Sequence, residues 1–325
     1  MSTPIPTVPP RRCVIGIDVA KDSFQAACAP GSDNISFAYD AAGIKALLEW
    51  LQGFSVELIV LEATGGYQRR LVAALTAAHY PLVVANPRQV RDFAKAKGIL
   101  AKSDPLDARV IADFAAVIKP EVRPLPTARQ QRLTDLVARR TQLIAMRTQE
   151  QNRLGQAADA DLTKSLNRSL KQLAKEIQKI EALIEATLDA CPDCAAKAAE
   201  LEKNTGVGRT SAIALVATLP EIGTLNRRQV VALAGLAPFN CDSGKFVGSR
   251  RIWGGRAPVR SVLYMIALTA IRFDQEMRRF YQNLLQKGKK KKVALTAVMR
   301  RILVRLNAKV RDALHLQPQF LKKAA

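Results

Sequence analysis

Residues 12–40, RCVIGIDVAKDSFQAACAPGSDNISFAYD, decide the fold of the first third of the chain. Three short apolar-rich runs, 12–20, 23–30 and 34–40, are separated by turn residues and predict three consecutive strands. Three hairpin-like strands followed by alternating helix and strand signals indicate an α/β domain with a mixed sheet, which we place at 1–122. The later signals predict helices over 41–53, 67–80, 88–97 and from 104 onward, and buried strands over 56–63 and 81–87.

The middle region, 123–192, has no strand signals and is predicted to be helical. Prolines between 120 and 126 mark its start, and a helix is expected over about 128–154, before a break at Gly155. A second helix carries a heptad seam formed by Leu166, Leu170, Leu173, Ile177, Ile180 and Ile184. The seam lasts only about three heptads, so an intramolecular helical hairpin and a dimerising coiled coil fit it equally well.

The last region, 193–325, is predicted to be mostly helical. Its stretch 205–212, TGVGRTSA, is a tight glycine turn that feeds an apolar helix. It resembles a helix-hairpin-helix element, whose backbone amides hold a DNA phosphate, although a lone GVG is a weak pattern. The glycine-rich segment 237–258 is expected to be a strand-poor loop, and two basic helices are expected around the lysine run 287–292.

The charge of the chain predicts a polyanionic partner. Its 325 residues include 50 Lys and Arg against 28 Asp and Glu, which gives a net charge of +22 and a pI near 10.2. Nucleic acid is the simplest such partner. No apolar run approaches the roughly 20 residues that span a bilayer, and the N-terminus has no apolar core of a signal peptide. We therefore expect a cytoplasmic protein without a membrane helix.

The cysteines do not predict a disulfide framework, because their number, five, is odd. Cys191 and Cys194 form a lone CPDC motif. A zinc site would need two more ligands, and the only histidines, His79 and His315, are far away in the sequence. We interpret CPDC as the end of a helix.

Four acidic residues form a candidate metal site. Asp18 and Glu62 each stand at the carboxyl end of a buried strand, where α/β sheets place their ligands. Asp104 and Asp107 stand at the start of a helix, where Asp104 is also a good capping residue. Such acids would repel one another without a cation, and Mg²⁺ prefers carboxylate oxygens and works on phosphates. The pattern predicts a Mg²⁺ site, in which the capped start of the helix would orient Asp104 and Asp107 toward the ion.

A second candidate centre is Ser243, which is surrounded in sequence by Lys245, Arg250, Arg251 and Arg256. These cations could bind a phosphodiester. A serine beside glycine is most often a turn residue, however, so the local pattern alone argues only weakly for a nucleophile. Cys241 is an alternative nucleophile, and Tyr264 is another, although its apolar helical setting favours a place in the core.

The order of these motifs resembles that of the DEDD-type insertion-sequence transposases, recombinases guided by a bridge RNA. The resemblance covers about Val14 to Lys292. It is carried by GIDVAKDSF, LEATGGY, NPRQVRDFAKAKG and KSDPLDA, then by TGVGRTSAIALVATLPEIG, LAGLAPFNCDSGK and GGRAPVRSVLYMIAL. The resemblance implies a RuvC-like, ribonuclease-H-type domain at 1–122, a coiled-coil region at 123–192 and a C-terminal transposase domain at 193–325.

The resemblance also implies a mechanism. The DEDD acids correspond to Asp18, Glu62, Asp104 and Asp107, and the nucleophilic serine corresponds to Ser243. In this family the serine forms a covalent phosphoserine link with DNA, aided by Mg²⁺ on the acids of a partner subunit. Donor and target DNA, a guide RNA and a homodimer or tetramer are implied as partners. The residues that we expect to contact nucleic acid are Gly206, Gly208, Arg209, Lys245, Arg250, Arg251, Arg256, Lys290, Lys291 and Arg300.

Two other functions remain open from the residues. A metal-dependent nuclease of the Holliday-junction type would use the four acids and water without a covalent link. A non-catalytic nucleic-acid-binding protein would need only the charge and the heptad seam, but it would leave the clustered carboxylates unexplained.

Overall fold

The computed structural model describes residues 11–31, 33–99, 104–122, 124–240, 242, 248 and 250–315. The chain divides into two compact units, Met1–Leu125 and Pro126–Ala325. Cys241, Ser243 and Lys245 lie outside the described residues, as does the side chain of Asp104.

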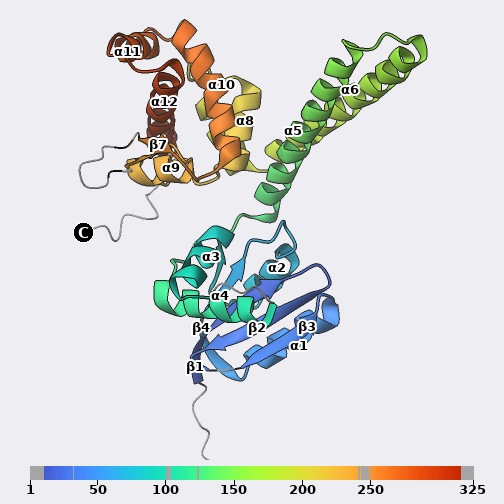
Figure 1. Ribbon diagram of the computed structural model, residues 1–325, viewed down its shortest axis with the longest axis vertical. Coiled ribbons are helices and arrows are strands. Elements are labelled where there is room, and N and C mark those ends of the chain that lie inside the picture. Colours follow the sequence, from blue (N-terminus) through green and yellow to red (C-terminus); the bar gives the residue numbers. More distant parts are fainter. Residues whose placement is uncertain are drawn as a thin grey trace, which may run out of the picture. The chain divides into compact units, whose positions relative to one another are not determined.

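The first unit is built on a mixed sheet with the strand order β3-β2-β1-β4-β5 (Figure 1). Its strands are β1 (Arg11–Val19), β2 (Ser23–Ala29), β3 (Asn34–Ala38), β4 (Phe54–Glu62) and β5 (Leu82–Ala85). The first three strands form an antiparallel meander, while β4 and β5 run parallel to β1. The predicted mixed α/β sheet is therefore confirmed, with each strand close to its expected position.

Helices cover both faces of this sheet (Figure 1). They are α1 (Ala41–Leu51), α2 (Arg69–Ala77), α3 (Pro87–Ala96) and α4 (Asp104–Ile118). On one face, Ile17 of β1 packs in a cluster with Leu47 of α1 and Leu71 of α2. On the other, Val60 of β4 packs with Ile111 of α4. Because side chains alternate along a strand, neighbouring residues of β1 and β4 belong to different layers.

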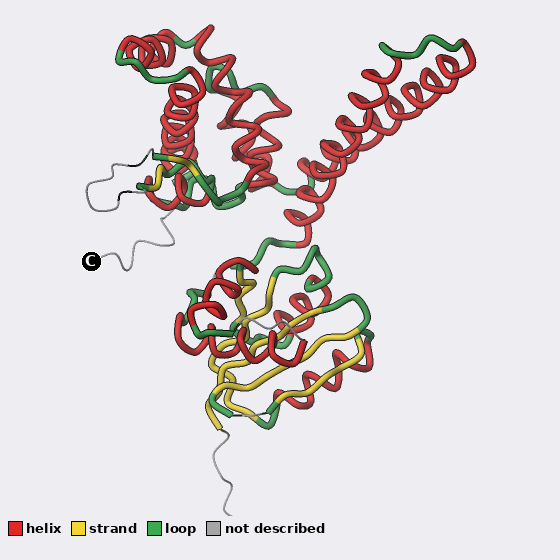
Figure 2. Tube along the Cα trace, in the orientation of Figure 1, coloured by secondary structure: helices red, strands yellow, loops and turns green. Residues whose placement is uncertain are grey.

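The second unit begins with a long helical hairpin, shown in Figure 2 as two paired red helices. Its helices are α5 (Ala128–Leu154) and α6 (Ala160–Asp189), which pack along one another. Thr127 caps α5 and Asp159 caps α6, each accepting a hydrogen bond from a backbone amide of the first turn. The seam residues Leu166, Ile177 and Ile184 are buried within this one chain. Of the two arrangements that fit the heptad seam, the structure shows the intramolecular hairpin.

The rest of the second unit is mostly helical, as predicted. Its elements are α7 (Pro192–Glu202), α8 (Arg209–Thr218), α9 (Arg227–Leu233), β6 (Pro238–Phe239), β7 (Arg251–Ile252), α10 (Ala257–Phe273), α11 (Gln275–Gln286) and α12 (Lys291–Ala313). The base of the helical hairpin shares their core, where Leu133 and Leu188 join Val216 and Leu303. In the described ranges, no helix combines the length and apolar character needed to cross a bilayer.

Two details differ from the expectations. The segment 237–258 contains an antiparallel pair of strands, β6 and β7, which are too short to give a sequence pattern. Tyr264, expected in the core, is 40% exposed on α10, because its helix buries the neighbouring Leu263 instead.

The CPDC motif starts a helix and does not end one. Cys191 is the N-cap of α7 and Pro192 occupies its first turn, directly after α6 ends at Asp189. The two cysteines are paired as a disulfide, contrary to the expectation from their odd number. Their Cα atoms are 5.3 Å apart, which the first turn of a helix allows.

Candidate functional site

Asp18 and Glu62 end two neighbouring parallel strands. Ile17 of β1 is paired with Leu61 of β4, so the two acids follow paired residues at the same edge of the sheet. Ile17 and Leu61 both face the α1 and α2 layer. Because side chains alternate, Asp18 and Glu62 both face the opposite layer, which contains α4. Both carboxylates are partly buried, and the structure brings these two predicted residues together.

Gly16 brings α4 against the strand that carries Asp18. A Cβ atom at Gly16 would lie 2.1 Å from the backbone nitrogen of Ala112 and 2.5 Å from the backbone oxygen of Ala108. Only glycine allows so close an approach of helix and strand. Gly16 is two residues before Asp18 and therefore on the same face of β1. The glycine was not singled out in the sequence, although an isolated glycine inside a strand pattern is the signal for such an approach.

The helix α4 adds Asp107, which is partly buried in its first turns. Asp107 is four residues before Ile111, whose backbone also approaches Gly16, so Asp107 and Ile111 share one side of the helix. Asp104 begins α4, but its side chain is outside the described part. The structure therefore places Asp107 on the helix that covers the face of Asp18 and Glu62.

The donor chemistry of these residues fits a hard divalent cation, because carboxylate oxygens are the ligands that Mg²⁺ prefers. Among the described side chains, no group of three or more His, Cys, Asp or Glu residues is positioned to hold a metal ion. Because the side chain of Asp104 is outside the described part, the structure does not test a metal site formed by all four acids.

A compact turn follows Glu62 and fixes the end of its strand. The backbone amides of Thr64 and Gly66 both donate to the side-chain oxygen of Gln68, each at 3.1 Å. The amide of Ala63 donates to the carbonyl of Ala85 at 3.2 Å and continues the pairing of β4 with β5. Gly66 has φ +104°, which favours glycine. The TGG turn thus holds Glu62 at the sheet edge through backbone contacts.

The second candidate centre is a hairpin loop. Strands β6 and β7 pair in antiparallel fashion, with Pro238 opposite Ile252 and Phe239 opposite Arg251. The segment 240–250, which contains Ser243, connects these strands. A carboxylate oxygen of Asp242 accepts a hydrogen bond from the amide of Gly248 at 3.0 Å. Asp242, the residue before the serine, is thus hydrogen-bonded to a residue six positions later in the chain.

Glycine contacts hold the base of this hairpin. Gly235, Gly254 and Gly255 have φ values of +68°, +69° and +61°, a region that other residues adopt only with strain. A Cβ atom at Gly235 would lie 2.2 Å from the backbone oxygen of Gly254. The guanidinium of Arg260 donates to that same oxygen at 2.5 Å and to the carbonyl of Ala234 at 3.1 Å. These contacts hold the turn at Gly235 against the turn at Gly254 and Gly255.

Arg256 lies at this base and makes a bidentate ion pair with Glu221. Its two terminal nitrogens are 2.7 and 2.6 Å from the two carboxylate oxygens. It also donates to the carbonyl of Thr218 at 3.0 Å, and its backbone amide donates to Leu233 at 2.9 Å. Bidentate pairs of this kind fix orientation as well as adding energy. Arg256 therefore anchors the hairpin within the second unit.

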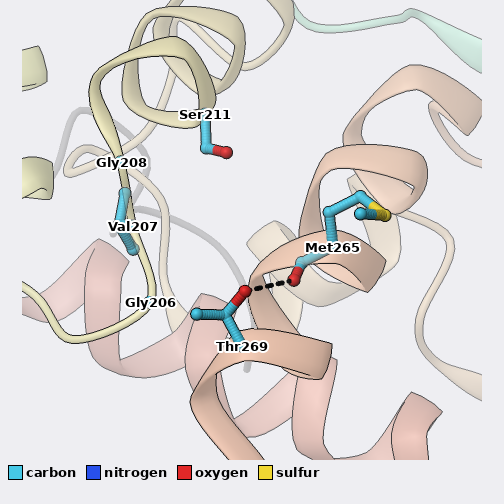
Figure 3. Close-up of a pocket in the computed structure, with 6 residues that line it drawn as sticks. All are labelled: Gly206, Val207, Gly208, Ser211, Met265 and Thr269. Carbon is cyan, nitrogen blue, oxygen red and sulfur yellow. Dashed lines mark hydrogen bonds between the residues drawn. The ribbon is translucent and has the colours of Figure 1, made fainter. Parts of the chain in front are cut away.

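The glycine turn before α8 lines a hollow of about 410 Å³. Gly206, Gly208 and Ser211 face Met265 and Thr269 of α10 across it (Figure 3). At Gly208, the N-cap of α8, an added Cβ would meet nothing within 4 Å. The start of α8 thus offers backbone amides to an open space, an arrangement that suits a phosphate.

Arg209, the first residue of α8, is engaged by two carboxylates. It lies 2.7 Å from Glu185 of α6 and 3.0 Å from Glu202 of α7. Hydrogen bonds to Glu185 and then to Glu202 raise the pKa of Arg209 above its ordinary value. Its side chain ties three helices together, while a role in nucleic-acid binding stays a prediction.

The other described residues that were predicted to contact nucleic acid are all exposed. They are Arg250, Arg251, Lys290, Lys291 and Arg300. Lys290 is the N-cap of α12, and Arg300 lies further along that helix. The exposed cations therefore lie on the β6–β7 hairpin and on α12 of the second unit.

Comparisons with known proteins agree with this architecture. Residues 15–160 match the DEDD-type model of the IS110 transposases, described as a transposase, and residues 198–282 match the model described as transposase IS116/IS110/IS902 family. The chain is also similar to the pilin gene-inverting proteins of Moraxella lacunata and Moraxella bovis. Each is 26% identical over 314 residues, which are 92% of this chain and 95% of the relative.

The two family matches cover the acid-bearing sheet and the serine-bearing helical unit in the order that the sequence predicts. Transposases and recombinases act on DNA by breaking and joining strands, so the protein is an enzyme of DNA recombination. The chain belongs to the IS110-type DEDD transposases.

Proposed function

We propose that this transposase is an RNA-guided DNA recombinase that exchanges donor and target strands through a covalent phosphoserine intermediate. The observation that carries the proposal is the placement of Asp18 and Glu62 directly after the paired residues Ile17 and Leu61, on the face covered by the helix of Asp107. Clustered carboxylates on so basic a chain favour a metal-dependent reaction on a polyanion over simple binding.

The acids Asp18, Glu62, Asp104 and Asp107 would hold Mg²⁺. DEDD-type transposases generally work with a divalent metal, and the carboxylate donors present here suit Mg²⁺. When bound, the ion stabilises negative charge on the phosphate under attack. Gly16 and the TGG turn act as positioning residues, because they fix the helix and the strand end that carry these acids.

Ser243 would be the nucleophile. Its oxygen forms a bond to phosphorus while the bond from phosphorus to the leaving deoxyribose oxygen breaks. The serine proton goes to solvent, and the leaving oxygen takes up a proton. One phosphodiester is exchanged for another, so rejoining needs no ATP. The exposed Arg250 and Arg251 would neutralise the phosphate, and Arg256 would hold the hairpin through Glu221.

Donor and target DNA and a guide RNA would be the nucleic-acid partners. The net charge of +22 supports contacts to nucleic-acid backbones, while base pairing to the RNA would choose the sequence. The predicted contacts are Gly206, Gly208, Arg209, Lys245, Arg250, Arg251, Arg256, Lys290, Lys291 and Arg300. The pilin gene-inverting relatives fit this reaction class, because inverting a gene requires DNA strands to be cut and rejoined.

The active assembly would be a homodimer or a tetramer, in which the acids of one subunit act with the serine of another. Apolar side chains remain exposed on the helical hairpin, with Met146, Leu162 and Leu183 exposed by 45%, 50% and 41%. A second hairpin packed against them would bury this apolar surface, which favours association.

A covalent-adduct assay tests the proposal. The purified protein, with any copurified RNA, is mixed with labelled donor and target duplexes and Mg²⁺. We expect a protease-sensitive protein-DNA adduct that is lost in Ser243→Ala and Asp18→Ala and after chelation or ribonuclease treatment. Ser261→Ala, at an exposed position of α10, and Asp22→Asn, at an exposed position after β1, are matched controls that should form the adduct normally.

Other outcomes would contradict parts of the proposal. Metal-dependent cutting without an adduct would indicate a junction nuclease that uses water, with Ser243 as a turn residue. An adduct that still forms after ribonuclease treatment would show that the reaction does not need a guide RNA. If the protein binds DNA but no divalent metal ion supports cleavage or adduct formation, it would be an architectural factor.

A further inference from the structure

The β6–β7 hairpin exposes two large aromatic side chains, one on each side of the segment 240–250 in the sequence. Trp253 is 53% exposed and Phe239 is 51% exposed. The chain has only two tryptophans, and the other, Trp50, packs against Phe37 and Phe54 in the first unit. Exposing an indole ring to water is costly, because it leaves a large apolar surface unburied. An aromatic pair in this position is therefore a candidate binding surface.

Phe239, Trp253 and Arg251 share one face of the hairpin. Phe239 is directly opposite Arg251 in the antiparallel pair. Trp253 is two residues after Arg251 and so points to the same side. The rings of Phe239 and Trp253 meet edge to face, with centroids 6.4 Å apart and planes at 86°. We call this set of three residues the aromatic face.

The aromatic face is rigidly supported. Trp253 directly precedes the Gly254–Gly255 turn, whose backbone abuts Gly235 and accepts a hydrogen bond from Arg260. Arg256 then fixes the start of α10 through its bidentate pair with Glu221. The exposure of Trp253 is therefore maintained by a fastened turn, which is the arrangement expected of a preorganised site.

The chemistry of the aromatic face fits an unpaired nucleotide. Aromatic rings stack on the faces of nucleobases regardless of sequence, and adjacent guanidinium groups bind the phosphates of the strand. Arg251 lies opposite Phe239, and Arg250 precedes it in the chain. Both are exposed, so the surface combines stacking with positive charge. A second protein surface would gain from the rings but would have to offset these cations.

We propose that the aromatic face stacks an unpaired nucleobase of the DNA strand whose phosphate Ser243 attacks. The proposal rests on the proposed function of Ser243. It adds a base-stacking site to a chain with only 5% aromatic residues, and makes Trp253 a positioning residue for the reaction.

Fluorescence of the full-length protein tests the stacking. In a Trp50→Phe background, Trp253 is the sole tryptophan, and we expect a single-stranded oligodeoxynucleotide to quench its emission. The wild-type protein serves as a second reporter if the background variant folds poorly. DNA with 2-aminopurine at successive positions around the cleaved phosphate should show quenching at one position. Trp253→Ala should remove that quenching and weaken single-strand binding about tenfold, while Trp253→Phe should retain most of it.

Phe273→Ala is the matched control. Phe273 is an aromatic residue 72% exposed on α10, at the far end of a helix that begins beside the hairpin at Ala257. Its removal should leave the 2-aminopurine signal and the affinity for single strands unchanged. Duplex DNA of the same sequence should bind Trp253→Ala within about twofold of wild type, because paired bases offer no free face.

The outcomes separate this proposal from the proposed function. An adduct that needs Ser243, formed by a protein whose Trp253 is not quenched and whose Trp253→Ala variant binds single strands normally, would overturn the stacking site alone. Quenching without any adduct would overturn the phosphoserine mechanism alone. Quenching by single-stranded RNA but not by DNA would show that the aromatic face binds RNA instead. A change in oligomeric state in Trp253→Ala would show that it binds a second copy of the chain.

Discussion

The two candidate centres of this transposase are positioned by different means. In the first unit, Asp18 and Glu62 extend from strands whose preceding residues are fully buried, so the hydrophobic core places them. In the second unit, the loop of Ser243 extends from strands of two residues each, with exposed side chains. The base of this hairpin is held by glycine contacts and by hydrogen bonds of Arg256 and Arg260. Core packing supports the strand ends of one centre, and backbone and polar contacts support the hairpin base of the other.

The largest effect should come from filling the contact between α4 and β1. The change Gly16→Ala puts a methyl group 2.1 Å from the backbone nitrogen of Ala112. Neither backbone can yield without moving the helix, so we expect the first unit to lose about 3 kcal/mol or more of its free energy of unfolding. Hydrogen exchange measured by mass spectrometry should show faster exchange in α4 and β1, and the covalent adduct should be lost.

Gly53→Ala is the control within the same unit. Its added Cβ would meet only the carbonyl oxygen of Trp50, at an ordinary contact distance of 3.5 Å. Its effect on exchange and on the adduct should be small. If Gly16→Ala were as stable as Gly53→Ala, the core would not be what fixes the acids, and the contrast between the two centres would fail.

The intermediate effect should come from the base of the hairpin. Gly235→Ala adds both a positive-φ strain and a clash, because its Cβ would lie 2.2 Å from the backbone oxygen of Gly254. Gly254→Ala adds the strain alone, since nothing lies within 4 Å of its Cβ. We expect Gly235→Ala to cost about 2 kcal/mol, and Gly254→Ala about 1 kcal/mol.

Thermal unfolding monitored by circular dichroism measures these stabilities. The adduct yield should fall further in Gly235→Ala than in Gly254→Ala, while exchange in α4 stays normal in both. Equal yields in the two variants would show that contact between the glycine turns does not hold the loop.

Sequence patterns predicted the strands next to the first candidate centre better than those next to the second, because only the first strands are long and buried. Long buried strands have a strong apolar signature, so the strand ends at Asp18 and Glu62 could be found directly. The helix start at Asp104 was also found, because Asp104 is a good capping residue. The close approach at Gly16 was missed, although its glycine signal was present.

The second centre has no such signature. Strands β6 and β7 hold two residues each, and two residues carry no period. The pairing of Arg256 with Glu221 joins residues 35 apart in the chain, and charge patterns do not predict contacts at that separation. Ser243 was identified only through family resemblance, and its role stays a prediction. The Cys191–Cys194 disulfide was missed because an odd number of cysteines argues against a framework of several disulfides but does not exclude one bonded pair.

The smallest effect should come from a polar contact between α11 and α12. Asp274 caps α11 by accepting from the amides of Glu276 and Met277, and it pairs with Arg305 of α12 at 2.8 Å. Burial raises the pKa of Asp274, but the hydrogen bonds from Arg305 and the backbone outweigh it and hold the pKa below the ordinary value of 3.8. Asp274→Asn keeps a capping oxygen and removes the charge, which should cost about 1 kcal/mol at neutral pH.

The pH dependence of this loss has a definite sign. A depressed folded-state pKa means that the contribution of the Asp274 carboxylate is fully present above its unfolded pKa. It is lost as the pH falls through the lower folded value. The stability difference between wild type and Asp274→Asn should therefore shrink as the pH is lowered below about 4, in urea titrations at a series of pH values. A difference that stays constant down to that range would show that shape and hydrogen bonding, and not charge, account for the contribution of Asp274. Adduct formation should be unchanged in Asp274→Asn at neutral pH, because Asp274 is not among the residues proposed to hold the metal, to attack the phosphate or to support the hairpin.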